Sequence, residues 1–269
     1  MSELVTDHIS FSQLTTAQEC PYAYYLLKIA GVEPVQNAFA EAGSLAHKLL
    51  AGWAKGEIPL QELPVEWIKN FSKEVTTEFP HFLASKGYRE KLFDAVLTYF
   101  EHFKGFPDCE VVGVEQLFTS SIAGEKFVGI IDLILRDKAT GGLTIVDYKS
   151  CSLRSFKRNG TQMYRQLLLY GKHCADRYGE FPAMLRFELL KENVYDERKF
   201  EKSEYIAARE WADHVIQEMK DRDFTLWFSV NPDYFRCTNL CSCRHECRCG
   251  KPEFFRKDNQ DEKRTCAVA

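Results

Sequence analysis

The sequence predicts a mixed α/β fold, or an α+β arrangement of the same elements. Three observations support this prediction: apolar residues recur at helical spacing up to about residue 105, they alternate over 109–150, and the helical spacing returns after about residue 161. The 269 residues, of which 45% are hydrophobic, suffice to bury a substantial core. No apolar run approaches the ~20 residues of a membrane span.

The N-terminal part is expected to be helical. Residues 10–30 begin with serines that can cap a helix, and they continue as an amphipathic helix interrupted near Pro21. A second helix is expected over 43–56, where a glycine stands at each end. Residues 64–105 keep the helical spacing, with one proline and one glycine as breaks.

The central part is expected to form strands. Residues 109–122 alternate and are rich in β-branched side chains. The stretch GIIDLILRDKATGGLTIVDYKS, residues 129–150, indicates two apolar strands joined by a polar turn at 138–141. The remaining expected elements are a helix, a strand and an amphipathic helix, over 161–178, 184–193 and 203–222.

Two carboxylates and a lysine interrupt the apolar strands of 129–150. Because side chains alternate along a strand, Asp147 and Lys149 share a face, and the turn places Asp132 roughly opposite Asp147. Burying bare carboxylates is costly, and one lysine neutralises only one of them. A divalent cation such as Mg²⁺ or Mn²⁺ would complete the balance. A structural ion pair on a solvent-facing hairpin is the alternative, and the short D-x-K spacing does not choose between them.

Further polar features follow these strands. Gln162, Gln166 and Tyr170 recur at i, i+4 spacing and share one helix face. Between Tyr148 and Ala175 the chain has six lysines and arginines and no acidic residue, which suits a polyanionic substrate. Each feature also has a plainer interpretation, as surface residues or a solvated basic loop.

The segment CTNLCSCRHECRC, residues 237–249, holds five of the ten cysteines. The N-terminus MSELVTDHISFSQL lacks the pattern of a secretory signal, so a cytoplasmic location is expected. In a reducing compartment, clustered thiolates indicate metal ligands rather than disulfides. A zinc ion, held by four sulfurs or with His245 replacing one, and an iron–sulfur cluster fit equally well, and free thiols are the third interpretation. Cys109, Cys151 and Cys174 are expected to be ordinary buried residues.

Five pieces of the chain resemble the RecB-like branch of the PD-(D/E)XK nucleases, which includes the CRISPR-associated RecB-like exonucleases. They are SFSQLTTAQECPYAYYL, GSLAH, GIID, VDYK and QLLLY, and they occur in the family's order over most of the chain. The resemblance implies a restriction-endonuclease-like core, with a central mixed β-sheet flanked by helices. It is expected as a single domain over 1–250, with a helical insertion at 57–105, the cysteine cluster at 237–249 and a polar tail at 251–269.

The resemblance also implies roles for individual residues. The expected metal site comprises His47, Asp132, Asp147 and the backbone carbonyl of Tyr148. Lys149 is the expected catalytic lysine, Gln166 and Tyr170 are expected beside the scissile phosphate, and Glu115 stands where some relatives carry an acid. A structural [4Fe–4S] cluster is implied, with zinc as the alternative. Its expected ligands are Cys20, Cys237, Cys241 and Cys247, although Cys243 and Cys249 are extra and the first gap is one residue longer than is common.

These features predict a Mg²⁺- or Mn²⁺-dependent deoxyribonuclease, an exonuclease acting on single-stranded DNA or duplex ends. Repair, recombination, and phage or CRISPR-type DNA processing all use such enzymes, so protein partners in a DNA-processing complex are expected and a membrane is not. A net charge of −4 requires the DNA interface to be a local patch. Two alternatives remain: a non-catalytic nuclease-like module that binds nucleic acid or a partner protein, and an unrelated zinc-binding regulator.

Overall fold

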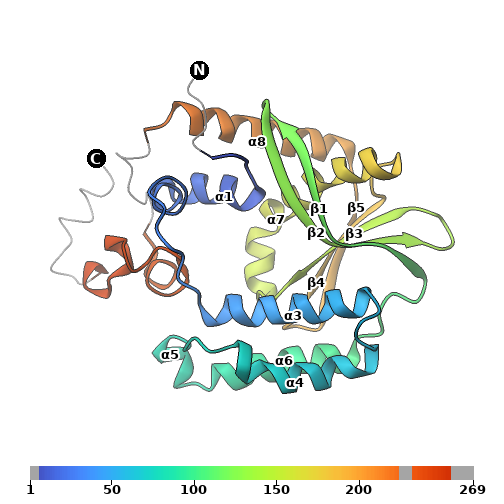
Figure 1. Ribbon diagram of the computed structural model, residues 1–269, viewed down its shortest axis with the longest axis horizontal. Coiled ribbons are helices and arrows are strands. Elements are labelled where there is room, and N and C mark those ends of the chain that lie inside the picture. Colours follow the sequence, from blue (N-terminus) through green and yellow to red (C-terminus); the bar gives the residue numbers. More distant parts are fainter. Residues whose placement is uncertain (1–5, 224–231, 256–269) are drawn as a thin grey trace. The chain divides into compact units, whose positions relative to one another are not determined.

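The computed structural model describes residues 6–223 and 232–255 of the chain (Figure 1). The mixed α/β fold is confirmed, because five strands form one mixed sheet that is flanked by helices. None of the helices in the described part of the chain is long and apolar enough to cross a membrane. The chain divides into two compact units, described separately below. The sheet unit comprises Ala38–Ser120 and Gly129–Arg209, and the terminal unit comprises Met1–Asn37, Ser121–Val128 and Glu210–Ala269. The single domain expected over 1–250 stays a prediction.

The sheet has the strand order β1-β2-β3-β4-β5. Strand β3 pairs antiparallel with β2 and parallel with β4, and β4 pairs antiparallel with β5. The parallel pair requires a crossover, which is a helix between β3 and β4. The strands are Cys109–Ile122 (β1), Glu125–Asp137 (β2), Leu143–Lys149 (β3), Met184–Leu189 (β4) and Val194–Lys199 (β5).

Strand β5 is absent from the sequence prediction, which also extended the preceding strand to residue 193. Five of the six β5 side chains are exposed, so this edge strand has no alternation of apolar and polar residues to reveal it. The first three strands are confirmed, although β2 begins at Glu125, before the predicted start at 129. The turn predicted at 138–141 is also confirmed, with Asp137 Oδ1 accepting a hydrogen bond from the Thr140 N–H at 2.7 Å.

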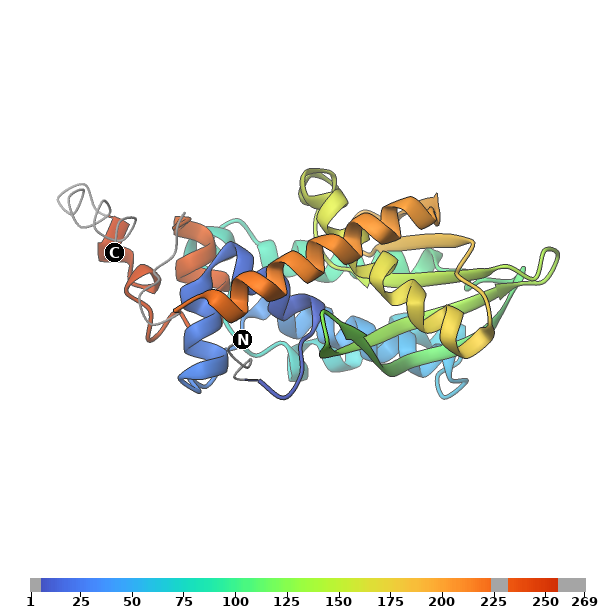
Figure 2. The same ribbon diagram turned by 90° about the horizontal axis from the view of Figure 1, so that it is seen from above.

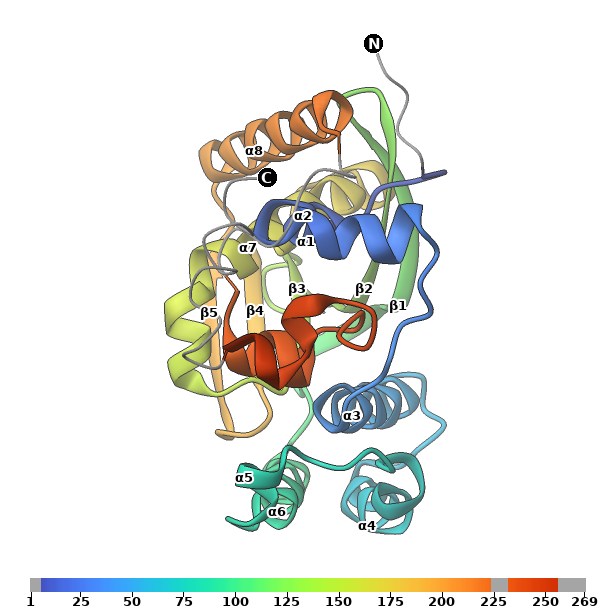
Figure 3. The same cartoon turned by 90° about the vertical axis from the view of Figure 1, so that its left-hand side faces the viewer.

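A group of helices packs together in the sheet unit, and Figure 3 shows α3, α4 and α6 nearly end-on. Trp67 of α4 and Phe100 of α6 are fully buried in the same core as Leu133 of β2. The prediction of broken helical structure over 64–105 is therefore confirmed. The helix predicted at 43–56 begins earlier, at Ala38, so Gly43 lies inside it. The bounds are Ala38–Ala54 (α3), Leu60–Glu62 (η2), Leu63–Glu74 (α4), His81–Ala84 (α5) and Tyr88–His102 (α6).

The crossover helix α7 spans Leu153–Tyr178 and starts eight residues before the predicted position. Ser152 caps it by accepting a hydrogen bond from the Ser155 N–H at 3.2 Å. The prediction missed the first turns because Phe156 is their only buried residue, so the apolar period is not visible there. Figure 3 shows that α7 changes direction along its length. Helix α8, Lys202–Asp221, is unbroken and drawn in orange in Figure 2.

In the terminal unit, the described C-terminal segment lies against the N-terminal helices. The Val35 N–H donates to the Ser242 carbonyl at 2.7 Å, and Arg244 donates to the Gln36 carbonyl at 2.7 Å. The predicted interruption near Pro21 is confirmed. The bounds are Phe11–Glu19 (α1), Pro21–Tyr24 (α2), Tyr25–Ile29 (η1), Arg236–Leu240 (η4), Arg248–Gly250 (η5) and Pro252–Phe255 (η6). Most of the predicted polar tail, 256–269, lies outside the described residues.

Candidate functional site

Asp132 of β2 and His47 of α3 meet in the sheet unit. His47 Nδ1 lies 3.3 Å from Asp132 Oδ2, and the same oxygen accepts a hydrogen bond from the Tyr148 N–H at 3.1 Å. One turn before His47, a Cβ on Gly43 would lie 3.2 Å from Ser150 Oγ. The glycine therefore lets α3 approach the end of β3 closely enough to place His47 on the carboxylate.

Asp147 and Lys149 form an ion pair on β3. Lys149 Nζ lies 2.7 Å from Asp147 Oδ2, and Asp147 is only 5% exposed. The β2–β3 ladder ends at the pair Leu133–Val146, so Asp132 and Asp147 are the next residues of the two strands. The three charged groups are therefore clustered as the alternation of the two strands predicts.

Helix α7 adds two more of the predicted site residues. Lys149 Nζ donates to Gln166 Oε1 at 3.3 Å, and Gln166 Nε2 donates to the Tyr170 hydroxyl at 3.2 Å. Tyr170 is 5% exposed, so it is a buried member of the site rather than a surface residue. A Cβ on Gly129, the glycine of GIID, would lie 2.6 Å from Phe118 and 2.8 Å from Tyr170. Only glycine leaves room for these two rings.

The charged groups of this cluster shift one another's pKa values. Burial raises the pKa of Asp147, and the Asp132 charge adds to this, while Lys149 only partly offsets both. Burial would also raise the pKa of Asp132, but the hydrogen bond and charge of His47 outweigh it and hold that pKa below its usual value. For Lys149 the desolvation is outweighed by Asp147, so its pKa is raised and the side chain is an ammonium at neutral pH.

Glu115 lies beside this cluster, together with a lysine that the sequence analysis did not single out. Glu115, His47 and Asp132 line the same small cavity. Lys55 Nζ lies 2.5 Å from Glu115 Oε2, and Glu115 has a φ of 45°, in the left-handed region that a glutamate rarely adopts. Lys55 follows His47 by eight residues and comes directly after Ala54, the last residue of α3, so helical spacing from His47 was the signal that could have identified it.

The side chains of this cluster are of chemical types that bind divalent cations. They offer carboxylate oxygens and an imidazole nitrogen, and Asp147 Oδ2 is a buried oxygen that accepts no hydrogen bond of good geometry. Across residues 6–223 and 232–255, however, no group of three or more histidine, cysteine or acidic side chains is positioned so that it could hold a metal ion.

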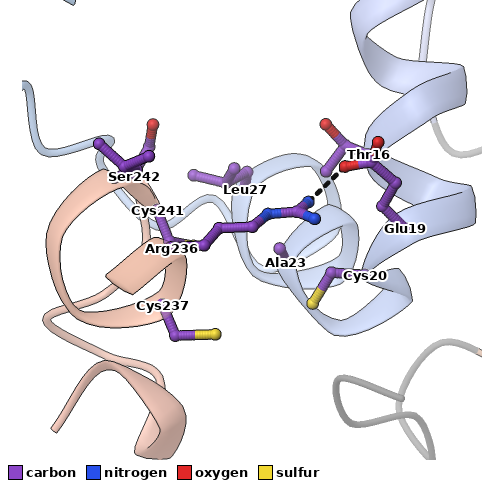
Figure 4. A pocket seen from close by; sticks show the side chains of 10 residues that line it. Thr16, Glu19, Cys20, Ala23, Leu27, Arg236, Cys237, Cys241 and Ser242 are labelled. Carbon is purple, nitrogen blue, oxygen red and sulfur yellow. Dashed lines mark ion pairs between the residues drawn. The ribbon is translucent and has the colours of Figure 1, made fainter. Parts of the chain in front are cut away.

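Three of the four predicted cluster ligands line one cavity in the terminal unit (Figure 4). Cys20 lies between α1 and α2, and Cys237 and Cys241 come from η4 and its end; the cavity measures about 310 Å³. The Arg236 guanidinium reaches Glu19 at 2.5 Å, as Figure 4 shows. Cys247 is 7% exposed and belongs to the same apolar cluster as the three cysteines.

The two extra cysteines are more deeply buried than the predicted ligands. Cys243 is 0% and Cys249 is 2% exposed, and the Cys243 and Cys241 sulfurs are 3.4 Å apart. Hydrogen bonding from Cys243 lowers the pKa of Cys241 to about 6, and hydrogen bonding from Cys249 lowers that of Cys247 to about 7. Two predicted ligands thus ionise readily, which soft-metal binding requires.

Residues 8–249 match the family described as the PD-(D/E)XK nuclease superfamily. Among solved structures, the chain is similar to a candidate exonuclease from Eubacterium rectale, with 14% identity and a TM-score of 0.47 over 90% of this chain and 88% of that one. A search of curated proteins finds no match.

Proposed function

The chain belongs to the PD-(D/E)XK nuclease superfamily, and from that premise we propose that it is a metal-dependent DNA exonuclease of the RecB-like branch. Its substrates would be single strands or duplex ends. The observation that carries this proposal is the run of contacts in the sheet unit from His47 and Asp132 to Asp147, Lys149, Gln166 and Tyr170. A cytoplasmic DNA-processing complex is the setting we propose for it.

Each side chain of the candidate site has a separate role in this proposal. His47, Asp132, Asp147 and the Tyr148 carbonyl would hold Mg²⁺ or Mn²⁺, which acidifies water and offsets charge on the phosphate. The Lys149 ammonium positions the attacking water and the phosphate oxygens. Gln166 accepts from Lys149 and so orients it. The Tyr170 hydroxyl accepts from Gln166 Nε2 and so holds the Gln166 amide in place, and burial raises its pKa to about 12.

Exposed cations close to the site in sequence support a polyanionic substrate. Arg154, Lys157 and Arg158 lie on the first turns of α7, soon after Lys149, and all three are exposed. Among the described residues, none of them pairs with a carboxylate, whereas Arg136, Arg186 and Arg198 do. We call Arg154, Lys157 and Arg158 the α7 cations, and they are available to bind phosphates.

Digestion of end-labelled DNA tests the proposal. Single-stranded, duplex and circular DNA are incubated with Mn²⁺ or Mg²⁺, with RNA of the same sequence for comparison. We expect cleavage of linear DNA from its ends, resistance of circles, and a loss of about 100-fold or more in Asp132→Asn and Lys149→Met. Lys69→Met, which removes an exposed lysine on α4, is the control. Equal cleavage by all variants would place the activity elsewhere, and DNA binding without cleavage by the wild type would favour a non-catalytic module.

We further propose that the cysteine site binds a structural [4Fe–4S] cluster, with zinc as the alternative. Cys20, Cys237, Cys241 and Cys247 would be the ligands, and four thiolates suit either group. The cavity of about 310 Å³ that three of them line supports this assignment. A cluster there would join α1–α2 to the C-terminal segment and remove chain entropy from the unfolded state.

Metal analysis after anaerobic purification separates these possibilities. We expect a brown protein containing iron and sulfide, and a loss of iron in Cys20→Ala and Cys237→Ala. Cys174→Ala is the matched control, because Cys174 is a fully buried cysteine of α7 in the sheet unit. A colourless protein with stoichiometric zinc would select the alternative. Full iron content in Cys20→Ala would remove that residue from the ligand set.

A further inference from the structure

Strands β1 and β2 expose two large aliphatic side chains. Leu117 is 68% and Ile130 is 54% exposed. The strands are joined by the two-residue turn Ala123–Gly124, in which both residues have positive φ, so Ile122 lies opposite Glu125. Counting back along both strands places Leu117 opposite Ile130. The two side chains are therefore cross-strand neighbours on one face and form a small apolar patch, which we call the Leu117–Ile130 pair.

This pair lies next to the candidate active site. Ile130 precedes Asp132 by two residues, so the two residues lie about 7 Å apart along β2. Leu117 follows Glu115 by two residues on β1, and Glu115 lines the same cavity as Asp132. The Leu117–Ile130 pair thus lies two residues along the strands from Glu115 and Asp132, which line the small cavity of the site.

The core does not explain why these positions are apolar. On the opposite face of the same strands, Phe118 packs edge-on against Tyr170 at 5.1 Å, and Gly129 faces both rings. Beyond the pair, the exposed side chains nearer the turn are polar: Thr119, Ser121 and Lys126. A single exposed aliphatic residue needs no explanation, but an exposed pair that includes a residue of the edge strand β1 favours unwanted association unless something uses it.

We propose that the Leu117–Ile130 pair is a nucleobase-contact site, against which a base beside the scissile phosphate packs. This inference rests on the proposed nuclease function. A phosphate at Asp132, Asp147 and Lys149 places the neighbouring base within reach, because the pair lies about 7 Å from Asp132. Leucine and isoleucine pack against base faces and insert between base steps. Such contacts accept any base, so the pair would hold the strand in register without selecting a sequence.

A protein–DNA double-mutant cycle tests this contact. Affinity is measured by fluorescence anisotropy without added metal, for a labelled single strand with one abasic nucleotide at each of the first six positions from its end. We expect the wild type to lose about tenfold in affinity at one or two of these positions. Leu117→Ser/Ile130→Ser should lose about the same on intact DNA and lose nothing further at those positions, which shows direct coupling.

The matched control is Val65→Ser/Ile68→Ser, which removes two aliphatic residues of α4 that are 57% and 55% exposed. It should behave as wild type on every strand. Additive losses in Leu117→Ser/Ile130→Ser would overturn the inference while leaving the nuclease proposal intact. A concentration-dependent dimer abolished by that variant would assign the patch to a second copy of the chain and also overturn it. A wild type that neither binds nor cuts DNA would refute the nuclease proposal and the inference with it.

Discussion

Lys149 Nζ lies 2.7 Å from Asp147 Oδ2, and the charge of a second carboxylate, Asp132 on the neighbouring strand, acts on both groups. Burial and the Asp132 charge together raise the pKa of Asp147 despite the lysine. Without a metal, Lys149 is therefore the main counter-charge of Asp147, and its removal should affect stability as well as chemistry.

The first prediction concerns this balance. Lys149→Met should lower the free energy of unfolding of the metal-free protein by about 3 kcal/mol, because it leaves a buried carboxylate without its counter-charge. The double variant Lys149→Met/Asp147→Asn should recover most of that loss. Urea denaturation in EDTA measures both. Lys69→Met, in an exposed pair, should unfold as wild type. A double variant no more stable than Lys149→Met would show that the loss is not electrostatic.

The second prediction concerns the glycine of GIID. Gly129→Ala should destabilise the fold by about 1–3 kcal/mol and displace Tyr170, because the added Cβ would lie within 2.8 Å of two rings. Gly160→Ala is the control, since a Cβ at that α7 position meets nothing within 4 Å. It should be neutral or stabilising, because alanine favours a helix interior. Thermal unfolding monitored by circular dichroism compares the stabilities of the two variants. Equal stability would contradict the packing of the Tyr170 ring against Gly129.

The third prediction concerns the α7 cations. Replacing all three with glutamine should reduce the slope of log affinity against log salt concentration by about 2 for single-stranded DNA, because each phosphate contact contributes about 0.7. Anisotropy titrations between low and moderate salt measure this slope. The matched control replaces three exposed lysines elsewhere in the sheet unit: Lys69, Lys73 and Lys86. An equal change in both variants would indicate a general charge effect rather than a phosphate-binding site.

The fourth prediction concerns pH and His173. Burial, together with the nearby Arg177, lowers the pKa of His173, whose Nε2 lies 2.9 Å from Gln116 Oε1. The unfolded chain therefore takes up this proton at higher pH than the folded chain does. Stability should fall as the pH drops below the ordinary histidine pKa of about 6.5. His173→Gln should remove this component from the stability–pH curve, whereas His81→Gln, at an exposed position, should not.

The wild-type stability–pH curve must be subtracted from that of His173→Gln, because His47 contributes to the pH dependence of stability with the opposite sign. The Asp132 hydrogen bond and charge overcome the burial of His47 and raise its pKa. Its stabilisation is fully present below the ordinary histidine pKa and is lost as the pH rises through the folded value. The free energy of unfolding of His173→Gln minus that of the wild type should rise as the pH drops. A flat difference would contradict the assigned sign.

Short-range rules placed the centre of the site from the sequence. Strand alternation put Asp147 and Lys149 on one face, and the turn length put Asp132 opposite Asp147, because both relationships depend only on the geometry of a hairpin. Helical spacing likewise aligned Gln166 with Tyr170. The positions of His47 and Cys20 came from the family resemblance alone, since no local rule relates them to partners so distant in the chain.

The sequence by itself thus determined the periodic elements and the hairpin that carries the acids. Only the tertiary structure decided which faces are covered. Strand β5 was invisible because its side chains are exposed, and Lys55 acquired a role only when α3 brought it to Glu115. Leu117 and Ile130 have the composition of core residues, yet the fold leaves them exposed beside Asp132. Burial is set by contacts between distant segments, and periodicity along one segment does not contain that information.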